Sequence, residues 1–208
     1  MNERFVRLGG WGLATASVVY AFAEVVRTLL GETNASPVAV AVGLIGVVAA
    51  SVIALTLAVI PAVHRGRAPI WTGVGYVCLG FAVMETGVAE GLMGTFLVPF
   101  LSAKGLLNSV PFGLIAVFML TALVSVIGSG CLGAAMLRAR CFSRWAPAGL
   151  LAAALLGVVG IALNLPRGPV GAGVVALLFS GLAVAGFQAA IGRERRPSEA
   201  HAVAPSPA

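Results

Sequence analysis

The sequence predicts an all-α membrane protein, with six transmembrane helices in one bundle and both termini in the cytoplasm. Three observations support this fold class: an extreme apolar composition, six apolar stretches of membrane-spanning length, and arginines that gather at alternate ends of those stretches. Apolar residues make up 60% of the 208 residues, charged residues only 10%, and the mean hydropathy is +1.05. A soluble domain is about one quarter charged. A particle of 20.9 kDa cannot hide this much apolar surface from water.

Six apolar stretches match the roughly 20 residues that one membrane crossing requires. They lie at about 8–30, 38–63, 69–91, 112–137, 147–165 and 169–191. We assign them to one transmembrane domain, residues 1–192. Residues 193–208 are polar and rich in Arg, Pro and Ala, a composition that predicts a disordered cytoplasmic tail.

Basic residues predict the orientation, because cytoplasmic loops retain Lys and Arg. Such residues precede the first stretch, join the second to the third and the fourth to the fifth, and follow the sixth: Arg4, Arg7, Arg65, Arg67, Arg138, Arg140, Arg144, Arg193, Arg195 and Arg196. The other side receives Lys104 and Arg167, with Arg27 near the end of its own stretch. We therefore expect both termini in the cytoplasm, as an even number of crossings requires.

The first, third and fifth stretches begin alike. Trp11, Trp71 and Trp145 each follow a basic residue at the start of a stretch. Indole rings favour the headgroup boundary of a membrane. Pro69 and Pro147 stand near the first helical position, where the missing N–H has no partner to lose. These features predict three helices that enter the membrane from the cytoplasmic side.

Two segments leave alternatives open. The start of the chain resembles a signal peptide that ends at Ala21-Phe22-Ala23, but apolar character resumes after Glu24, so we expect an uncleaved helix. Residues 91–111 are too apolar for an ordinary loop and too short for another crossing. Either a kinked continuation of the third helix or a short helix in the outer interface fits them, with Pro99 as the break.

Ionisable residues inside the stretches are the most informative candidates for a site, since intramembrane charge is costly. Glu24 and Arg27 stand three residues apart on one helix face and can form an ion pair. Tyr20, four residues before Glu24, lies on the same face. If the third helix is centred near residue 80, Glu85 lies at the depth of Glu24, with Glu90 nearer the outer interface. We predict a ligand-binding cluster of Tyr20, Glu24, Arg27 and Glu85.

Three interpretations of this cluster remain open: an ion pair that locks two helices, an outward-opening pocket for a small cation, proton or lipid headgroup, and an interface with another protein. A polar stripe of Thr121, Ser125 and Ser129 on the fourth stretch has two interpretations, hydroxyls bonded within or between helices or a wetted path. His64 and Cys141 are expected to be solvent-exposed. The cysteines and histidines show no metal-binding spacing, and we expect no metal and no cofactor.

Two short patterns resemble a known family. The first is Arg7-x-x-Gly10, then Tyr20 and the run Phe22-Ala23-Glu24-Val25-Val26-Arg27; the second is Arg144-Trp145-x-x-x-Gly149. They are similar to a bacterial family of six-helix integral membrane proteins that is catalogued as a domain of unknown function. The resemblance implies the same fold and location and no particular reaction, and no match extends to the central outer segment. An Arg-, Ala-, Gly- and Val-rich composition likewise favours a bacterial source, and the resemblance implies a location in the inner membrane.

No nucleophile, metal cluster or nucleotide motif accompanies the intramembrane charges. We therefore expect a non-enzymatic component that binds a small molecule or ion, transporter-like or accessory, whose partners are the lipid bilayer and either another membrane protein or a second copy of the chain. The basic residues flank apolar stretches, which excludes a nucleic-acid partner. Two alternatives stay open: an enzyme acting on a lipid or isoprenoid with Glu24 or Glu85 as general acid, and a scaffold subunit of a membrane complex.

Overall fold

A computed structural model describes residues 3–31, 34–64, 66–106, 112–163 and 167–192. These residues form helices and no strand, in agreement with the predicted all-α fold. The elements are α1 (Glu3–Leu30), α2 (Pro37–Thr56), α3 (Val59–His64), α4 (Pro69–Ala82), the π-helices η1 (Val83–Glu90) and η2 (Met93–Leu97), α5 (Val98–Ala103), α6 (Phe112–Ala139), α7 (Trp145–Ala162) and α8 (Arg167–Ala190). The predicted tail at 193–208 lies outside the described residues.

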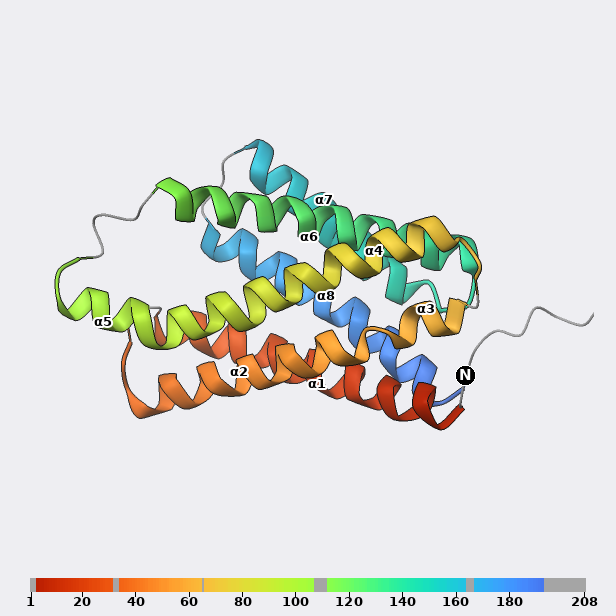
Figure 1. Ribbon diagram of the computed structural model, residues 1–208, viewed down its shortest axis with the longest axis horizontal. Coiled ribbons are helices and arrows are strands. Elements are labelled where there is room, and N and C mark those ends of the chain that lie inside the picture. The colour runs from red at the N-terminus through yellow and green to blue at the C-terminus, as the bar shows by residue number, and fades with distance from the viewer. Residues whose placement is uncertain (1–2, 32–33, 65, 107–111, 164–166, 193–208) are drawn as a thin grey trace, which may run out of the picture.

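Within the described residues, six long helices are apolar enough to cross a membrane, as predicted (Figure 1). Two of them combine several elements: α2 and α3 form one helix over Pro37–His64, and α4, η1, η2 and α5 form one over Pro69–Ala103. We call the latter the third helix. Local sequence explains several ends. Ser36 caps α2 by accepting a hydrogen bond from the amide of Ala39, and Pro69 opens the third helix.

The third helix is longer than the sequence predicted, because it continues past residue 91 to Ala103. The continuation is the first of the two alternatives for this segment, and no separate interfacial helix forms within 91–106. Pro99 does not break the helix. It lacks an N–H and its ring crowds the carbonyl of Thr95, but the preceding π-helical turn, Met93–Leu97, follows a wider i→i+5 pattern that gives this carbonyl room.

The six helices form a ring in chain order. Each one packs against its neighbours in the sequence, and α8 closes the ring by packing against α1. Because consecutive helices run in opposite directions, α1 begins where α8 ends (Figure 1). We call this the terminal end of the bundle; the opposite end is where α1 and α5 end and α8 begins.

Glycines bring backbones into contact in the half of the bundle near the terminal end. A Cβ on Gly186 of α8 would lie 2.6 Å from the amide nitrogen of Ala14, and one on Gly10 of α1 would lie 2.7 Å from the carbonyl oxygen of Gly186. A Cβ on Gly149 of α7 would likewise lie 2.9 Å from the Cα of Gly181 on α8. Small residues permit such close approach where no hydrophobic force drives membrane helices together.

Two glycines of α7 in the other half meet side chains instead of backbones. A Cβ on Gly157 would lie 2.6 Å from Cγ2 of Val126, and one on Gly160 would lie 2.8 Å from Cγ1 of Val170. These helix pairs are held further apart by the intervening side chain. The bundle is therefore tightly closed near the terminal end and more loosely packed towards the opposite end.

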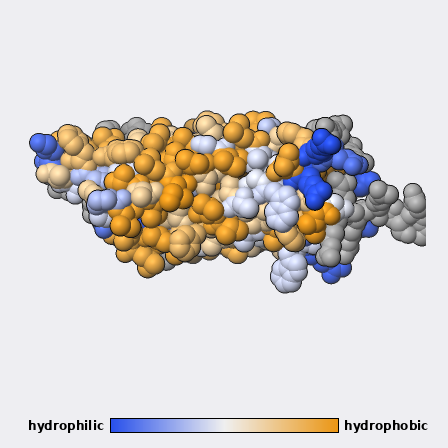
Figure 2. All heavy atoms as spheres, turned by 90° about the horizontal axis from the view of Figure 1, so that it is seen from below, coloured by the Kyte–Doolittle hydropathy of each residue, from blue (hydrophilic) through white to orange (hydrophobic). Residues whose placement is uncertain are grey.

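The surface of the bundle carries an apolar band. Figure 2 shows, on one face, hydrophobic residues over the middle and hydrophilic residues gathered at the two ends. Many large apolar side chains are exposed, among them Leu29, Leu55 and Ile70 at 81%, 78% and 77%. The interior also holds a continuous core, centred on buried residues such as Leu13, Leu79 and Leu132. An apolar surface around an apolar core is what a helix bundle in lipid requires.

Candidate ligand-binding cavity

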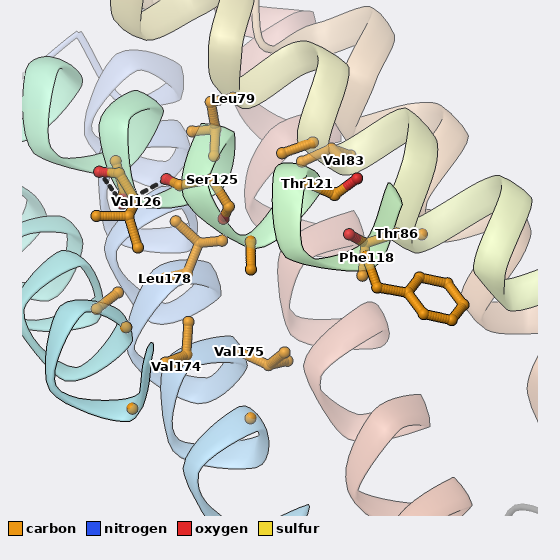
Figure 3. A pocket seen from close by; sticks show the side chains of 18 of the residues that line it. Leu79, Val83, Thr86, Phe118, Thr121, Ser125, Val126, Val174, Val175 and Leu178 are labelled. Carbon is orange, nitrogen blue, oxygen red and sulfur yellow. Dashed lines mark hydrogen bonds between the residues drawn. The ribbon is translucent and has the colours of Figure 1, made fainter. Parts of the chain in front are cut away.

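A cavity of about 320 Å³ lies within the ring. Its walls come from α4 and η1, α6, α7 and α8, and α1 contributes Tyr20. In Figure 3 the side chains of Val174 and Leu178 on α8 lie across the cavity from those of Ser125 and Val126 on α6. The volume falls at the lower end of the range for small-molecule sites, roughly 300–1,000 Å³.

The position of the cavity follows from the uneven packing of α4 and α6. A Cβ on Gly75 would lie 2.7 Å from the amide nitrogen of Leu132, and one on Gly128 would lie 2.6 Å from that of Leu79. From Val83, where η1 begins, the contact between α6 and the third helix becomes sparse. Leu79 also lines the cavity, which occupies the space that the two helices leave as they diverge. The glycine contacts near the terminal end thus close the cavity on that side.

The lining is mainly apolar, with a small number of polar groups. The polar residues are Tyr20, Thr86, Glu90, Thr121, Ser125 and Ser129. Larger apolar residues, such as Val83 and Phe179, and glycines on η1, α7 and α8 make up most of the remainder. Apolar walls with a few convergent polar groups are typical of binding sites for small molecules.

The polar stripe of α6 is part of this lining. The hydroxyl of Thr121 donates to the carbonyl of Val117 at 3.1 Å, and that of Ser129 donates to the carbonyl of Ser125 at 2.7 Å. The prediction that these hydroxyls bond within their own helix is confirmed for Thr121 and Ser129. All three residues of the stripe nevertheless border the cavity. The two predicted interpretations therefore do not exclude each other.

Tyr20 joins α1 to two walls of the cavity. Its ring lies 4.5 Å from the ring of Phe179 between centroids, and its Cε2 atom lies 3.4 Å from where a Cβ on Gly87 would stand. Tyr20 is only 3% exposed and lies within reach of the charges of Glu24, Arg27 and Glu90. The ring therefore lies at ordinary contact distance from this position of the third helix, and the side chain that a Cβ on Gly87 would overlap is that of Ala50 on α2.

The predicted pair of Glu24 and Arg27 is present. Nη1 of Arg27 lies 3.6 Å from Oε1 of Glu24, one helical turn away on the same face. The guanidinium of Arg27 rests against Gly94 of η2, where any Cβ would overlap it. Both side chains are partly buried, at 23% and 28% exposure. The pair therefore lies between α1 and the third helix, and neither residue lines the cavity.

Glu85 lies deeper than predicted. Gly87 faces Tyr20 and Gly94 faces Arg27, so a residue of the third helix is level with the α1 residue numbered 67 lower. Glu85 is thus level with Val18, about 9 Å from the level of Glu24 at about 1.5 Å per residue. The prediction of equal depth is wrong because the helix reaches Ala103, which moves its centre to about residue 86.

Glu85 is separate from the other candidate residues. Its Oε2 atom is buried and has no hydrogen-bond partner among the described residues, and it forms no ion pair with Arg27 there. Glu85 does not line the cavity either. The structure therefore brings together Tyr20, Glu24 and Arg27, while Glu85 stands apart near the middle of the third helix.

Glu90 and Thr86 line the cavity, although neither belongs to the predicted ligand-binding cluster. Their helix was expected to end at residue 91, which placed Glu90 at a helix end near the interface. The apolar run after Glu90, LMGTFLVPF, was the signal that the helix continues. Reading this run as part of the same crossing would have moved Glu90 into the membrane.

Polar contacts at the terminal end join the loops and correct two expectations. His64 is 1% exposed, and its Nδ1 atom lies 2.7 Å from Oγ1 of Thr72. Cys141 is 5% exposed, and its sulfur accepts a hydrogen bond from Nη1 of Arg67 at 3.4 Å. Both were expected to be solvent-exposed. The chain folds back over them, since Phe142 packs edge-on against the His64 ring at 5.7 Å between centroids.

Among the described residues, no group of three or more His, Cys, Asp or Glu side chains could hold a metal ion. In comparisons with known proteins, no family model, no curated protein and no solved structure matches this chain.

Proposed function

We propose that this chain is a multi-pass protein of the bacterial inner membrane that binds a small, largely apolar molecule in the cavity, as a transporter-like or accessory component and not as an enzyme. The observation that carries the proposal is the cavity itself, which has apolar walls, few polar groups and a volume of about 320 Å³. Such a site suits a ligand with an apolar body and a single polar group. The resemblance to a six-helix bacterial membrane family remains a prediction.

The distribution of arginines supports an orientation with both termini in the cytoplasm. Arg4, Arg7, Arg67, Arg138 and Arg140 all belong to the terminal end of the bundle. Positive residues stay on the cytoplasmic side. The opposite end then faces outwards, and the cavity lies in the outward half of the membrane, beyond the glycine contacts that close the terminal end.

The lining favours a binding protein over the enzyme considered above. That enzyme uses Glu24 or Glu85 as general acid, and neither carboxyl lines the cavity. Glu24 instead forms an ion pair with Arg27 between α1 and the third helix, outside the cavity. The scaffold alternative has less support, because it accounts for no cavity.

Native mass spectrometry of the gently solubilised protein tests occupancy of the cavity. Ser125→Phe places a large ring in the cavity, and Leu123→Phe places the same ring on the exposed face of α6 as a matched control. We expect a co-purifying small molecule on the wild type and on Leu123→Phe, and none on Ser125→Phe. Bare protein in all three samples, or a molecule that persists on Ser125→Phe, overturns the proposal.

Thiol labelling tests the orientation and the access route. In a variant without Cys78, Cys131 and Cys141, a cysteine is introduced by Ser125→Cys or, as the control, by Leu123→Cys. We expect a membrane-impermeant thiol reagent added outside sealed cells to label Ser125→Cys, because the proposed orientation places the cavity in the outward half of the bundle. Leu123→Cys faces lipid and should stay unlabelled. Labelling of Ser125→Cys only from the cytoplasmic side contradicts the proposed orientation.

A further inference from the structure

We infer that the ligand of the cavity is an uncharged carbonyl compound with an apolar body, such as a ketone, an ester or a quinone, whose oxygen accepts a hydrogen bond from Tyr20. This inference rests on the proposed function and specifies its ligand class. It follows from three properties of the lining: the hydroxyl of a buried tyrosine, a second hydroxyl at the same level, and the apolar walls around both.

Tyr20 carries a hydroxyl that has no hydrogen-bond partner among the described residues. The residue is buried, borders the cavity and packs its ring against that of Phe179. The rigid ring holds the hydroxyl away from the carbonyls of its own helical turn, to which serine and threonine hydroxyls can donate. Because a buried hydroxyl without a partner carries a desolvation penalty, a ligand that accepts its proton gains affinity.

Thr86 supplies a second donor at the same level. It precedes Gly87, the position that the ring of Tyr20 contacts, and it also borders the cavity. Most helical threonines among the described residues donate to a carbonyl one turn earlier, as Thr95 and Thr121 do. The described residues offer no such partner to the hydroxyl of Thr86. A carbonyl oxygen has two lone pairs, one for each of the two donors.

The donors and the walls favour an uncharged acceptor. Both donors are neutral hydroxyls, and most of the lining is apolar. Figure 3 shows aliphatic side chains from three helices around the cavity: Val83 of η1, Val126 of α6 and Leu178 of α8. Burying an ionised group among such side chains costs far more than burying a hydrogen-bonded neutral group. A carbonyl also has no proton of its own that would need an acceptor in these walls.

Four probes of similar size test the inference: acetophenone, 1-phenylethanol, α-methylstyrene and benzoate. On the same phenyl ring they carry a carbonyl, a hydroxyl, an alkene without oxygen and a carboxylate. Binding to the full chain in lipid nanodiscs is measured by titration calorimetry, and protein-free nanodiscs of the same lipid correct for partition into the bilayer. We expect acetophenone to bind more tightly than 1-phenylethanol and benzoate.

Two matched variants identify the group responsible. Tyr20→Phe and Tyr76→Phe each remove one phenol hydroxyl, and Tyr76 of α4 is partly buried against the core and does not border the cavity. We expect Tyr20→Phe to weaken binding of acetophenone roughly two- to tenfold, as the loss of one neutral hydrogen bond does. Tyr76→Phe should bind it as the wild type does. The binding of α-methylstyrene, which has no acceptor, should be the same in all three proteins.

The carbonyl stretching band of bound acetophenone reports the hydrogen bond directly, because a hydrogen bond to the oxygen lowers the frequency of this band. With an isotopic label in the carbonyl, the band should lie at lower frequency on the wild type and on Tyr76→Phe than on Tyr20→Phe. The ligand-free stability of Tyr20→Phe should match that of the wild type, since its hydroxyl has no partner in the described chain to lose.

The outcomes separate this inference from the proposed function. If Tyr20→Phe binds acetophenone as tightly as the wild type does, or if 1-phenylethanol or benzoate binds more tightly than acetophenone, the carbonyl ligand class is wrong. The cavity remains a binding site in that case, provided that Ser125→Phe abolishes binding and Leu123→Phe does not. If none of the probes binds, or if Ser125→Phe leaves binding intact, both the proposed function and this inference are overturned.

Discussion

The guanidinium of Arg27 on α1 lies against Gly94 of the third helix and fills the space that a Cβ at residue 94 would take. Seven residues earlier on each helix, the ring of Tyr20 contacts the position of Gly87, 3.4 Å from where a Cβ would stand. These two contacts fix the register of α1 against the third helix. They also set which acidic residue borders the cavity, because they place Glu90 beside Tyr20 and leave Glu85 deeper and apart.

The close contact of α1 and α8 should be sensitive to a single methyl group. We expect Gly186→Ala to lower the free energy of unfolding by about 1–3 kcal/mol. The new Cβ would stand 2.6 Å from the backbone nitrogen of Ala14, which cannot move aside without shifting the helix. Unfolding in mixed micelles with increasing denaturing detergent measures this change.

Gly73→Ala is the matched control, because nothing lies within 4 Å of a Cβ at that position of α4. We expect it to leave stability unchanged or slightly raised. Gly94→Ala should have an intermediate effect, since it meets the mobile end of the Arg27 side chain and no backbone. Equal losses in all three variants would contradict this account of the packing.

The pair of Glu24 and Arg27 should contribute little through direct attraction. A double-mutant cycle with Glu24→Gln and Arg27→Met should give a coupling free energy of about 0.2–1 kcal/mol, as partly exposed pairs do. The 3.6 Å separation and the partial exposure of both side chains underlie this value. A coupling several times larger would show that the pair is isolated from water and acts as a lock between α1 and the third helix.

Glu85 should be a destabilising residue in the isolated chain. Its Oε2 atom is buried without a hydrogen-bond partner among the described residues, which carries a desolvation penalty. We expect Glu85→Leu to raise the free energy of unfolding by about 1–3 kcal/mol. A loss of stability in the same unfolding assay would show instead that Glu85 has a partner in the membrane.

The hydrogen bond between His64 and Thr72 should hold the connection between α3 and α4. Thr72→Val removes the hydroxyl and leaves Nδ1 of the buried His64 without its partner. We expect a loss of about 1–3 kcal/mol in stability. Thr72→Ser keeps the hydroxyl and should retain most of the stability. If both variants are equally destabilised, the methyl group and not the hydrogen bond is responsible.

Local patterns predicted the helices well and the third one incompletely. Apolar length gave all six helices, and the Pro69 start was placed correctly because a proline at the first helical turn loses no hydrogen bond. The local rule also predicts a break at Pro99, because a proline inside a helix removes a backbone hydrogen bond. The structure accommodates it through the π-helical turn before it, an adjustment that depends on the whole third helix and has no short sequence signal.

Hydropathy and helical periodicity predict the six apolar helices and place Glu24 and Arg27 on one helix face, because both act over a few turns. The position of the cavity and the carboxyl that borders it follow from contacts between helices. Those outcomes depend on the distance between helices and on their register. Gly75 and Gly128 bring α4 and α6 into backbone contact on one side of the cavity, and the contact of Arg27 with Gly94 sets the register of α1 against the third helix, which carries Glu90. Contacts between residues so far apart in the chain leave no local periodicity from which they could be read.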